Sequence, residues 1–582
     1  MILPGLPVSG MWSTSNATDS VSPLMAKREA GGLTKTRNSR SATGKEDVVD
    51  IKTVLILIFG LFASSVAVAG PSAILTADRP IIFTERGPVW GTATPTLRTF
   101  LGIPYAAPPV RKLRWRPPQD HARWYAPLNA TRYANHCPQV GSVFGSPSTN
   151  EDCLFLNIFI PNDDAEDRQI FHSYPVMVWI HGGALSVGES DDYLPRKLVQ
   201  QGHLIVVTVN YRLGALGFLA HPALTAESPD HISGNYGIMD QQFALKWVQR
   251  NIAAFGGDPQ NVTIFGESAG GLSVFSQLAS PTAAGSFHRA IVESGAYGLT
   301  LPALSDEEAH GEAFAASVGC NDQSARCLRS VSVETVLANW GLFDSSIVAD
   351  GKVLPQSLDT AFATGQFNHV PLMQGTNHDE WRFFVALSFD LSGAPIAPEE
   401  YPSVVEGMFG PAAAPLVLAE YPLDKFDSPD LAIGAIGTDA IFACPAHTAD
   451  QVLSTQVATF AYEFNDVNAP EVFLPPVSFP YGATHASELL YLFKLPWPGR
   501  LDAQQQKLSE SMIRYWTQFA KAGDPNSSGV PFWRQYDATV DEFQSLAPLS
   551  PRSEFEFVSD HKCDFWATLF GANAQSAARI SK

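Results

Sequence analysis

Residues 262–270, Val-Thr-Ile-Phe-Gly-Glu-Ser-Ala-Gly, decide the fold of this chain. The apolar stretch at 262–265 predicts a strand, and the residues after Gly270 are compatible with a helix. A strand that enters a tight turn and then a helix holds Ser268 on a strained elbow, with its hydroxyl at the sheet edge. A side chain at Gly266 or Gly270 would collide with the backbone that crosses this turn. In this context the G-x-S-x-G pattern indicates a serine nucleophile.

Two later segments can supply the carboxylate and the base that a serine nucleophile needs. Residues 371–376 predict a short buried strand that leads into Asp379 and Glu380. His485 ends a loop broken by Pro and Gly, and the run at 486–493 predicts a helix. In folds with this elbow the chain order is Ser, then Asp or Glu, then His, and these segments fit it. Spacing alone leaves Asp379 and Glu380 nearly equal, because side-chain direction alternates at a strand end.

An upstream loop can supply the hydrogen-bond donors for an oxyanion. Residues 176–180 predict a buried strand, which ends in His-Gly-Gly-Ala at 181–184. Small residues there let backbone N–H groups approach a carbonyl oxygen. The predicted donors are the amides of Gly183, Ala184 and Ala269, the last directly after the nucleophile.

Longer motifs carry a resemblance to a known family. Residues 255–270 (FGGDPQNVTIFGESAG) and 151–157 (EDCLFLN) match the two signatures of the type-B carboxylesterase/lipase family, which includes the cholinesterases and fungal lipases. Further matching blocks lie at 100–109, 210–218, 234–247, 516–520 and 563–566. The resemblance extends over 74–571, and it implies one α/β-hydrolase domain. Such a domain has a large, mostly parallel central sheet flanked by helices, with long loop insertions that form an active-site gorge.

The resemblance also implies the roles of the site residues. Ser268 is the expected nucleophile, His485 the general base and then acid, and Glu380, rather than Asp379, the carboxylate that orients the histidine. Glu267 is similar to the family's buried glutamate beside the nucleophile, which tunes the electrostatics of the site. The implied reaction is carboxylic ester hydrolysis through an acyl-enzyme, without a cofactor. We also expect no metal site, since the sequence has no HExxH or CxxC motif and its histidines lack ligand spacing.

Two other functions stay open: a triacylglycerol lipase on the same fold, and a non-catalytic, adhesion-type member of the family. Adhesion-type members typically lack the serine or the histidine, and both are present here. In the family the loop at 138–152 roofs the gorge, and in cholinesterases it carries a tryptophan that binds a quaternary ammonium. Here the loop has no tryptophan and is much shorter than the flap of interfacial lipases. We therefore expect an esterase for small, soluble esters, whose acyl and alcohol groups stay open.

The cysteines indicate an oxidising compartment. Their number is six, which is even and which order alone could pair in fifteen ways. The resemblance selects three pairs: Cys137–Cys153, Cys320–Cys327 and Cys444–Cys563. Glycosylation sequons at Asn129 and Asn526 agree with a secretory route, whereas a third, at Asn261, is expected to be buried and unmodified.

The N-terminal region predicts export. Residues 54–62 are apolar, and the run continues without a charge to an Ala-Val-Ala cleavage site at 67–69, which predicts a signal peptide at 51–69. The run is short for a membrane span of about 20 residues. The polar leader at 1–50 is far longer than a normal n-region, and we interpret it as a gene-model artefact. We expect a secreted protein without stable membrane association; an uncleaved signal-anchor, giving a type II membrane protein with an external catalytic domain, is the alternative.

The charge argues against a nucleic-acid partner. The formal net charge is -20, and such an acidic surface repels phosphate backbones. The sequence has no internal repeat and no linker that predicts a second folded domain. It leaves the oligomeric state open.

Overall fold

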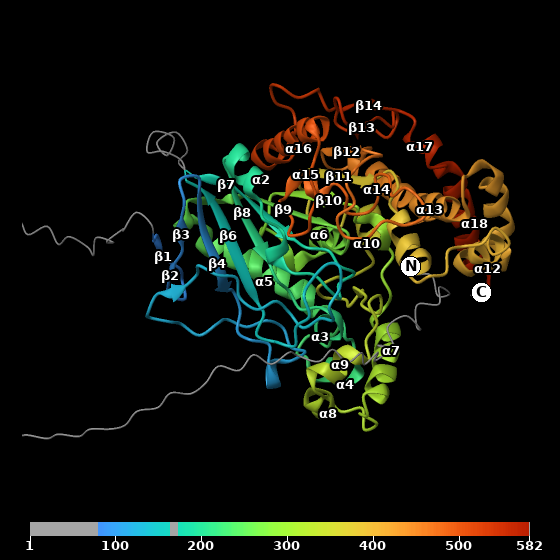
Figure 1. Cartoon of the computed structure of the whole chain (residues 1–582). Helices are drawn as coiled ribbons and strands as arrows, with labels where there is room; N and C mark the ends of the chain where they lie inside the picture. Colours follow the sequence, from blue (N-terminus) through green and yellow to red (C-terminus); the bar gives the residue numbers. More distant parts are fainter. Residues whose placement is uncertain (1–78, 163–172, 581–582) are drawn as a thin grey trace, which may run out of the picture. The chain divides into compact units, whose positions relative to one another are not determined.

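The computed structural model describes residues 79–162 and 173–580. The predicted leader at 1–50 and signal peptide at 51–69 lie outside the described residues. A mixed sheet of eleven strands forms the centre of the fold (Figure 1), in the order β14-β13-β12-β11-β10-β9-β7-β8-β6-β4-β3. These strands are β3 (Thr92–Ala93), β4 (Leu97–Pro104), β6 (Phe155–Pro161), β7 (Tyr174–Ile180), β8 (Ile205–Val209), β9 (Gly257–Glu267), β10 (Arg289–Glu293), β11 (Leu372–Asn377), β12 (Thr459–Phe464), β13 (Phe543–Leu546) and β14 (Arg552–Glu554).

The inner strands of this sheet, from β8 to β13, run parallel, and the outer ones pair antiparallel. A second, small sheet contains β1 (Ile81–Phe83), β2 (Pro88–Trp90) and β5 (Leu128–Asn129). Parallel strands need crossover connections, and long helices supply them here. The carboxyl ends of the parallel strands therefore meet at one edge, where residues far apart in sequence come together.

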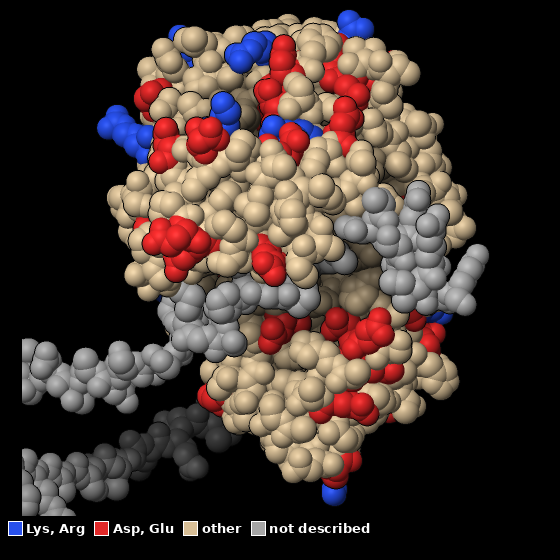
Figure 2. Space-filling model, turned by 90° about the vertical axis from the view of Figure 1, so that its right-hand side faces the viewer, with Lys and Arg blue, Asp and Glu red and all other residues tan. Residues whose placement is uncertain are grey.

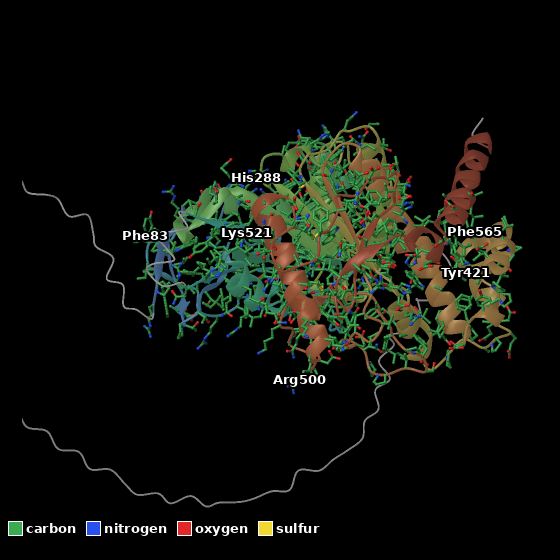
Figure 3. The ribbon with its side chains drawn as sticks, turned by 90° about the horizontal axis from the view of Figure 1, so that it is seen from above. Phe83, His288, Tyr421, Arg500, Lys521 and Phe565 are labelled. Carbon is green, nitrogen blue, oxygen red and sulfur yellow. A yellow bond between two sulfur atoms is a disulfide. The ribbon has the colours of Figure 1, made fainter. Side chains whose placement is uncertain are left out.

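Side-chain alternation along the buried strands divides the core into two layers. In β7, Val176, Val178 and Ile180 face one layer, which α5 (Tyr236–Asn251) and α6 (Ala269–Ala279) cover. Met177 and Trp179 face the other layer, which α2 (Arg196–Gly202) and α16 (Ala503–Ala522) cover. Figure 3 shows α16 between the labelled residues Arg500 and Lys521. A strand buried on both faces explains why β7 is apolar at nearly every position.

The remaining α-helices cover the ends and flanks of the sheet. They are α3 (Gly214–Phe218), α4 (Pro222–Glu227), α7 (Leu304–Ser317), α8 (Ala325–Ser330), α9 (Val333–Ala338), α10 (Leu358–Ala363), α11 (Arg382–Val385), α12 (Tyr401–Glu420), α13 (Pro429–Gly437), α14 (Cys444–Ser454), α15 (Leu489–Leu492), α17 (Phe557–Asp560) and α18 (Cys563–Ile580). Within the described residues one segment, Tyr401–Lys425, is long and apolar enough to span a bilayer by length and composition. Gly410, with φ 75°, interrupts its helical backbone.

Local sequence signals mark both ends of helix α16. The side chain of Asp502 accepts hydrogen bonds from the backbone N–H groups of Gln504 and Gln505, and Gln505 reaches back to complete a capping box. At the other end Gly523 adopts φ 75° and stops the helix. The local signals thus set both ends of this helix.

Two predicted elements differ from the structure. The helix predicted at 486–493 is reduced to Leu489–Leu492, because Ala486 adopts the left-handed φ of 66° and breaks the turn that leads into it. The strand predicted at 262–265 extends over Gly257–Glu267, since β7 and β10 pair with it on its two sides.

Three disulfides join the cysteines: Cys137 to Cys153, Cys320 to Cys327, and Cys444 to Cys563. This is the pairing that the resemblance implies. The third bond closes a sequence separation of 119 residues and attaches the start of α18 to the start of α14. On the surface, Figure 2 shows acidic side chains gathered in several groups, with few basic ones in the lower half of the view.

Candidate active site

The nucleophile elbow has the strained geometry that the sequence predicts. Ser268 lies between β9 and α6 with φ 56° and ψ -123°, and its side chain is only half-buried. A Cβ atom at Gly270 would lie 2.0 Å from the carbonyl oxygen of Ile180, and one at Gly266 would lie 2.6 Å from the same oxygen. Neither position can therefore carry a side chain without moving β7 or the elbow.

The structure brings Glu380, and not Asp379, to His485. Nδ1 of His485 lies 2.5 Å from Oε2 of Glu380, and both side chains are buried. The other oxygen of Glu380 accepts hydrogen bonds of 2.8 Å from the hydroxyl of Thr376 and the backbone N–H of Asn377. These bonds fix the carboxylate at the end of β11, so that it can orient the imidazole.

Asp379 points elsewhere. Its carboxylate accepts a 2.9 Å hydrogen bond from the backbone N–H of Ala483 and forms a 2.8 Å ion pair with Arg382. It thereby connects β11 to the loop that carries His485. The choice between two neighbouring acids, which spacing left open, follows from the direction of their side chains.

The second nitrogen of His485 faces the elbow. Nε2 lies 3.2 Å from Oε1 of Glu267, the residue before Ser268. Among the described residues no hydrogen bond joins the Ser268 hydroxyl to His485, and the phenol of Tyr297 is another polar group beside that hydroxyl. The structure thus brings Glu380 into contact with His485 and places Glu267, the neighbour of Ser268, against the other side of the imidazole.

Buried carboxyl groups surround the imidazole and shift its protonation. Burial lowers the pKa of His485, but the charges of Glu267 and Glu380 outweigh burial and raise the pKa to about 9. Burial raises the pKa of Glu267 to about 8, against the opposing charge of His485. Burial, together with the charge of Glu380, also raises the pKa of Glu488 to about 7. The site holds a proton more tightly than isolated side chains would.

The sequence did not lead us to predict two buried acids near the site, Glu488 and Glu293. Glu488 lies three residues after His485, and Asn377 donates a hydrogen bond of 2.5 Å to it. The carboxyl of Glu293 accepts a 2.7 Å hydrogen bond from Trp516, and burial raises its pKa well above the usual value. The sequence signal that could have indicated Glu488 is its place next to the apolar run that follows it. Glu293 ends a buried strand, where such a residue requires a partner.

The predicted oxyanion loop lies against the nucleophile. A Cβ atom at Gly182 would lie 3.1 Å from Cβ of Ser268, which measures how closely the two backbones approach. Gly183 and Ala184 adopt positive φ angles of 99° and 53° and are partly exposed. Within the described part of the chain, the backbone N–H groups of Gly183, Ala184 and Ala269 have no acceptor. Three unused donors beside a serine are suited to a developing negative charge.

His181 stabilises this loop. Its ring stacks on Tyr211 with centroids 4.5 Å apart, and its Nδ1 lies 2.9 Å from the carbonyl oxygen of Gly182. The hydroxyl of Tyr211 donates a 2.8 Å hydrogen bond to the backbone oxygen of His181. Burial lowers the pKa of His181 to about 4, so that this ring is neutral.

Aromatic rings form the wall beside the imidazole. The centroids of Phe384 and Phe442 lie 5.1 Å from that of His485. Phe144, from the loop between Cys137 and Cys153, packs against Phe383 and Phe473 with centroids 5.5 and 5.1 Å apart. The roof loop therefore closes onto an apolar wall.

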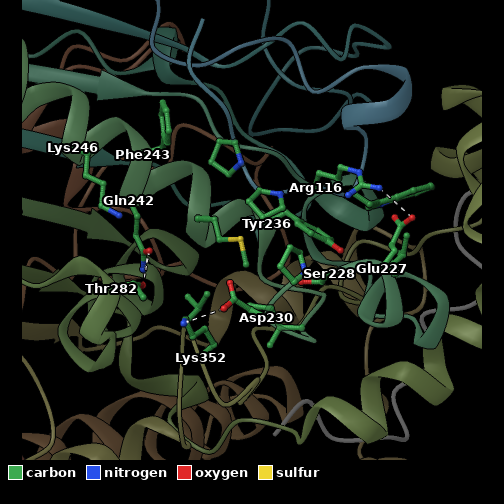
Figure 4. A pocket seen from close by; sticks show the side chains of 18 residues that line it. Arg116, Glu227, Ser228, Asp230, Tyr236, Gln242, Phe243, Lys246, Thr282 and Lys352 are labelled. Carbon is green, nitrogen blue, oxygen red and sulfur yellow. Dashed lines mark hydrogen bonds and ion pairs between the residues drawn. The ribbon is translucent and has the colours of Figure 1, made fainter.

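A cavity of about 350 Å³ lies elsewhere, and none of the predicted catalytic residues lines it (Figure 4). Its apolar surface includes Trp115, Met239 and Phe243. Ion pairs of Arg116 with Glu227 and of Lys352 with Asp230, at 3.2 and 3.1 Å, lie along it. This cavity is separate from the candidate active site.

A mostly parallel sheet with an elbow serine, followed in the chain by a glutamate and then a histidine, defines an α/β-hydrolase. Comparison with known proteins is more specific: residues 78–566 match the Carboxylesterase family. The chain belongs to this family, and it is a carboxylic ester hydrolase. The predicted α/β-hydrolase fold is confirmed.

Individual relatives agree with this assignment. The chain is 35% identical to an acylcarnitine hydrolase of Mus musculus, over 82% of this chain and 89% of that protein. It is also 35% identical to a para-nitrobenzyl esterase of Bacillus subtilis (strain 168), over 79% of this chain and 92% of that protein. Among solved structures, a thermophilic PNB esterase superposes with a TM-score of 0.71 at 32% identity, covering 84% of this chain and 99% of that one.

Proposed function

We propose that the chain hydrolyses carboxylic esters through an acyl-enzyme formed on Ser268. The Ser268 hydroxyl gives its proton to the unprotonated Nε2 of His485 and attacks the ester carbonyl carbon. The tetrahedral oxyanion accepts hydrogen bonds from the amides of Gly183, Ala184 and Ala269. Hydrogen bonds at an active site often tighten only when substrate is bound, so this step does not require the hydrogen bond between Ser268 and His485 in the free enzyme.

Breakdown of the intermediate uses the same groups in reverse. His485 returns its proton to the alcohol oxygen as the C–O bond breaks, and the acyl group stays on Ser268. Water then gives a proton to His485 and attacks the acyl carbon. The bond between Oγ of Ser268 and the acyl carbon breaks as His485 returns that proton to Oγ, and the carboxylic acid leaves. Glu380 orients the imidazole throughout and stabilises its charged form.

The contact of 2.5 Å between Glu380 and His485, behind a strained serine, carries this proposal. A labelled organophosphonate tests it, because such a reagent modifies only an activated serine. We expect one label per chain on Ser268 and none on Ser268→Ala. An unlabelled wild-type chain would contradict catalysis by this site and favour the adhesion-type alternative.

We further propose that the substrates are small, soluble esters with apolar groups. The rings of Phe383, Phe384 and Phe442 beside His485 support an apolar subsite. The roof loop is short and packs inward through Phe144, so it offers little apolar surface to a lipid interface.

Two substrates separate this esterase from the lipase alternative. We expect faster turnover of p-nitrophenyl butyrate than of an emulsified long-chain triglyceride. A preference for the emulsion, with a rise in rate when the interface forms, would contradict the esterase proposal.

The secretory route remains a proposal as well. Three disulfides support an oxidising compartment.

The glycosylation sequons differ in how accessible their amides are. Asn129 is exposed, and its oxygen accepts a 2.8 Å hydrogen bond from Thr131, which leaves its amide hydrogens available for a glycan. The amide of Asn526 instead donates to Asp524 and Trp533, both at 2.8 Å, so we favour Asn129 as the modified site. Asn261 is half-buried rather than buried, and its oxygen accepts from Arg289.

The mass of the secreted chain tests this route. Cleavage after Ala69 predicts an N-terminus at Gly70. An N-terminus upstream of residue 60 would exclude that cleavage and favour the signal-anchor.

A further inference from the structure

Two histidines and a glutamate meet at the carboxyl ends of β11 and β12, outside the catalytic residues. His378 follows β11, Glu463 lies in β12, and His561 lies between α17 and α18. Each can offer one ligand atom, such that these three atoms lie within 4.8 Å of one another. The residues are far apart in the chain, so no sequence motif announces them.

The register of the sheet explains why they meet. β11 and β12 are parallel, with Thr376 opposite Glu463 and Asn377 opposite Phe464. The backbone N–H of His378 donates a 3.1 Å hydrogen bond to the carbonyl oxygen of Phe464, which continues the ladder past the strand end. Here β11 and β12 position the first two residues.

The third residue comes from the C-terminal segment. The rings of His561 and His378 have centroids 5.5 Å apart, and Nε2 of His561 lies 2.6 Å from Oε1 of Glu463. Two residues later, Cys563 forms the disulfide with Cys444, whose Sγ lies 3.3 Å from the carbonyl oxygen of His561. In Figure 3 this C-terminal segment is marked by Phe565, with Tyr421 next to it.

Each of the three residues has an outer partner that orients it. Nδ1 of His378 lies 3.2 Å from Oδ1 of Asp379, and Nδ1 of His561 lies 2.6 Å from Oδ1 of Asp439. The other oxygen of Glu463 accepts a 2.7 Å hydrogen bond from Asn465. Carboxylates that hold the far nitrogen of each imidazole are the usual outer partners of histidines that bind metals.

We propose that His378, Glu463 and His561 form a binding site for one divalent, zinc-like cation. Two imidazoles and one carboxylate are a ligand set that zinc takes in open, tetrahedral sites, with the fourth position free for water. Zinc–ligand bonds of about 2.1 Å hold tetrahedral ligand atoms about 3.4 Å apart, so small side-chain shifts suffice. The ion replaces the proton shared by Nε2 of His561 and Glu463, and this proton passes to solvent.

The burial of the three residues provides an entry path. His561 and Glu463 are 3% and 1% exposed, whereas the side chain of His378 is 37% exposed. An ion can therefore reach the inner pair from the side of His378. Once bound, the ion would connect the segment before α18 to the ends of β11 and β12. This connection lies close in the chain to Glu380, which contacts His485.

Metal binding to the full mature chain tests the site. After treatment with a chelator, the protein is dialysed against Zn²⁺ and its metal content is measured, and Co²⁺ serves as an optical probe. We expect about one ion per chain and the visible spectrum of tetrahedral Co²⁺ with nitrogen ligands. Less than stoichiometric binding, or the spectrum of an octahedral, all-oxygen site, would overturn the proposal.

Variants locate the ion. His378→Ala should weaken binding at least tenfold, and Asp379→Asn should weaken it about tenfold through loss of the orienting contact. His310→Ala is the matched control, because His310 is 41% exposed and also pairs with a nearby acid, Glu307, at 3.4 Å. It should bind as the wild type does.

A second group of possible ligands offers an alternative site for the ion. His136, Glu189 and Asp191 also place ligand atoms within 4.8 Å of one another. Binding that survives in His378→Ala but is lost in His136→Ala would assign the ion to that group and overturn the proposal. A circular dichroism spectrum of each variant shows whether loss of binding comes from unfolding.

Discussion

At the scale of single residues, the imidazole of His485 is held between two acids with different tasks. Glu380 contacts Nδ1 and orients the ring, whereas Glu267 faces Nε2, the nitrogen that must accept the serine proton. Both charges favour the protonated ring and raise the pKa of His485 to about 9. Because only the neutral ring can act as a base, activity should rise with pH through the neutral and mildly alkaline range.

Glu267→Gln tests this arrangement. Removing a negative charge beside the imidazolium lowers the pKa of His485, so the acidic limb of the kcat/KM profile should move to lower pH, by about one pH unit or more. The measurement is kcat/KM for p-nitrophenyl butyrate between pH 5 and about 10. Asp450→Asn is a control, since Asp450 is buried and the charge that acts on it is that of Asp541. An unmoved limb in Glu267→Gln would show that Glu267 does not set the basicity of the site.

Ser268→Ala tests the nucleophile itself. The substitution removes one half-buried hydroxyl, so the fold should survive. We expect kcat to fall at least about 10³-fold, with an unchanged melting temperature. Near-normal turnover would refute the assignment of Ser268.

At the scale of elements, the strand–turn–helix unit of β9, Ser268 and α6 was the most predictable part of the site. Its signals are local: apolar alternation, two glycines and a helix-compatible run within residues 257–279. The region around His485 was less predictable. A helix over 486–493 fits the pattern, but Ala486 adopts φ 66° and the helix begins only at Leu489.

Gly270→Ala tests the tightness of the elbow. A Cβ atom there would lie 2.0 Å from the carbonyl oxygen of Ile180, so β7 and α6 must separate. We expect the free energy of unfolding to fall by about 1–3 kcal/mol or more, together with a loss of activity. Denaturant unfolding and an ester assay measure the two effects.

Gly571→Ala is the matched control, since a Cβ atom there would meet nothing within 4 Å. Its activity should equal that of the wild type, and its free energy of unfolding should not fall, since Gly571 lies inside α18, where alanine is more favourable than glycine. Equal behaviour of the two variants would show that the approach of β7 to the elbow does not constrain residue 270.

At the scale of the whole molecule, the sequence predicted the layered α/β arrangement. It did not by itself predict the contacts between residues that are far apart in the chain. The family signatures implied Glu380 and His485, whose separation of 105 residues no periodicity could bridge. His561 and Glu463, 98 residues apart, had no motif and were missed. Contacts between strand ends depend on the order of strands in the sheet, which a single sequence does not encode locally.

The disulfides allow a test at this scale. The Cys444–Cys563 bond spans 119 residues and the Cys320–Cys327 bond spans seven. Because a longer closed loop restricts the unfolded chain more, replacing the first pair by alanine should cost about 2 kcal/mol more than replacing the second. Denaturant unfolding of the two double variants measures the difference. A larger loss for the Cys320–Cys327 pair would contradict this expectation.

The edges of the large sheet have a consequence for handling the protein at high concentration. The outermost strands, β3 and β14, are two and three residues long, and β14 carries the charged residues Arg552 and Glu554. Short, charged edges offer few unpaired backbone groups to a second copy, so they hinder edge-to-edge aggregation. Concentrated solutions of the folded enzyme should therefore resist fibril formation, although eleven strands share one sheet.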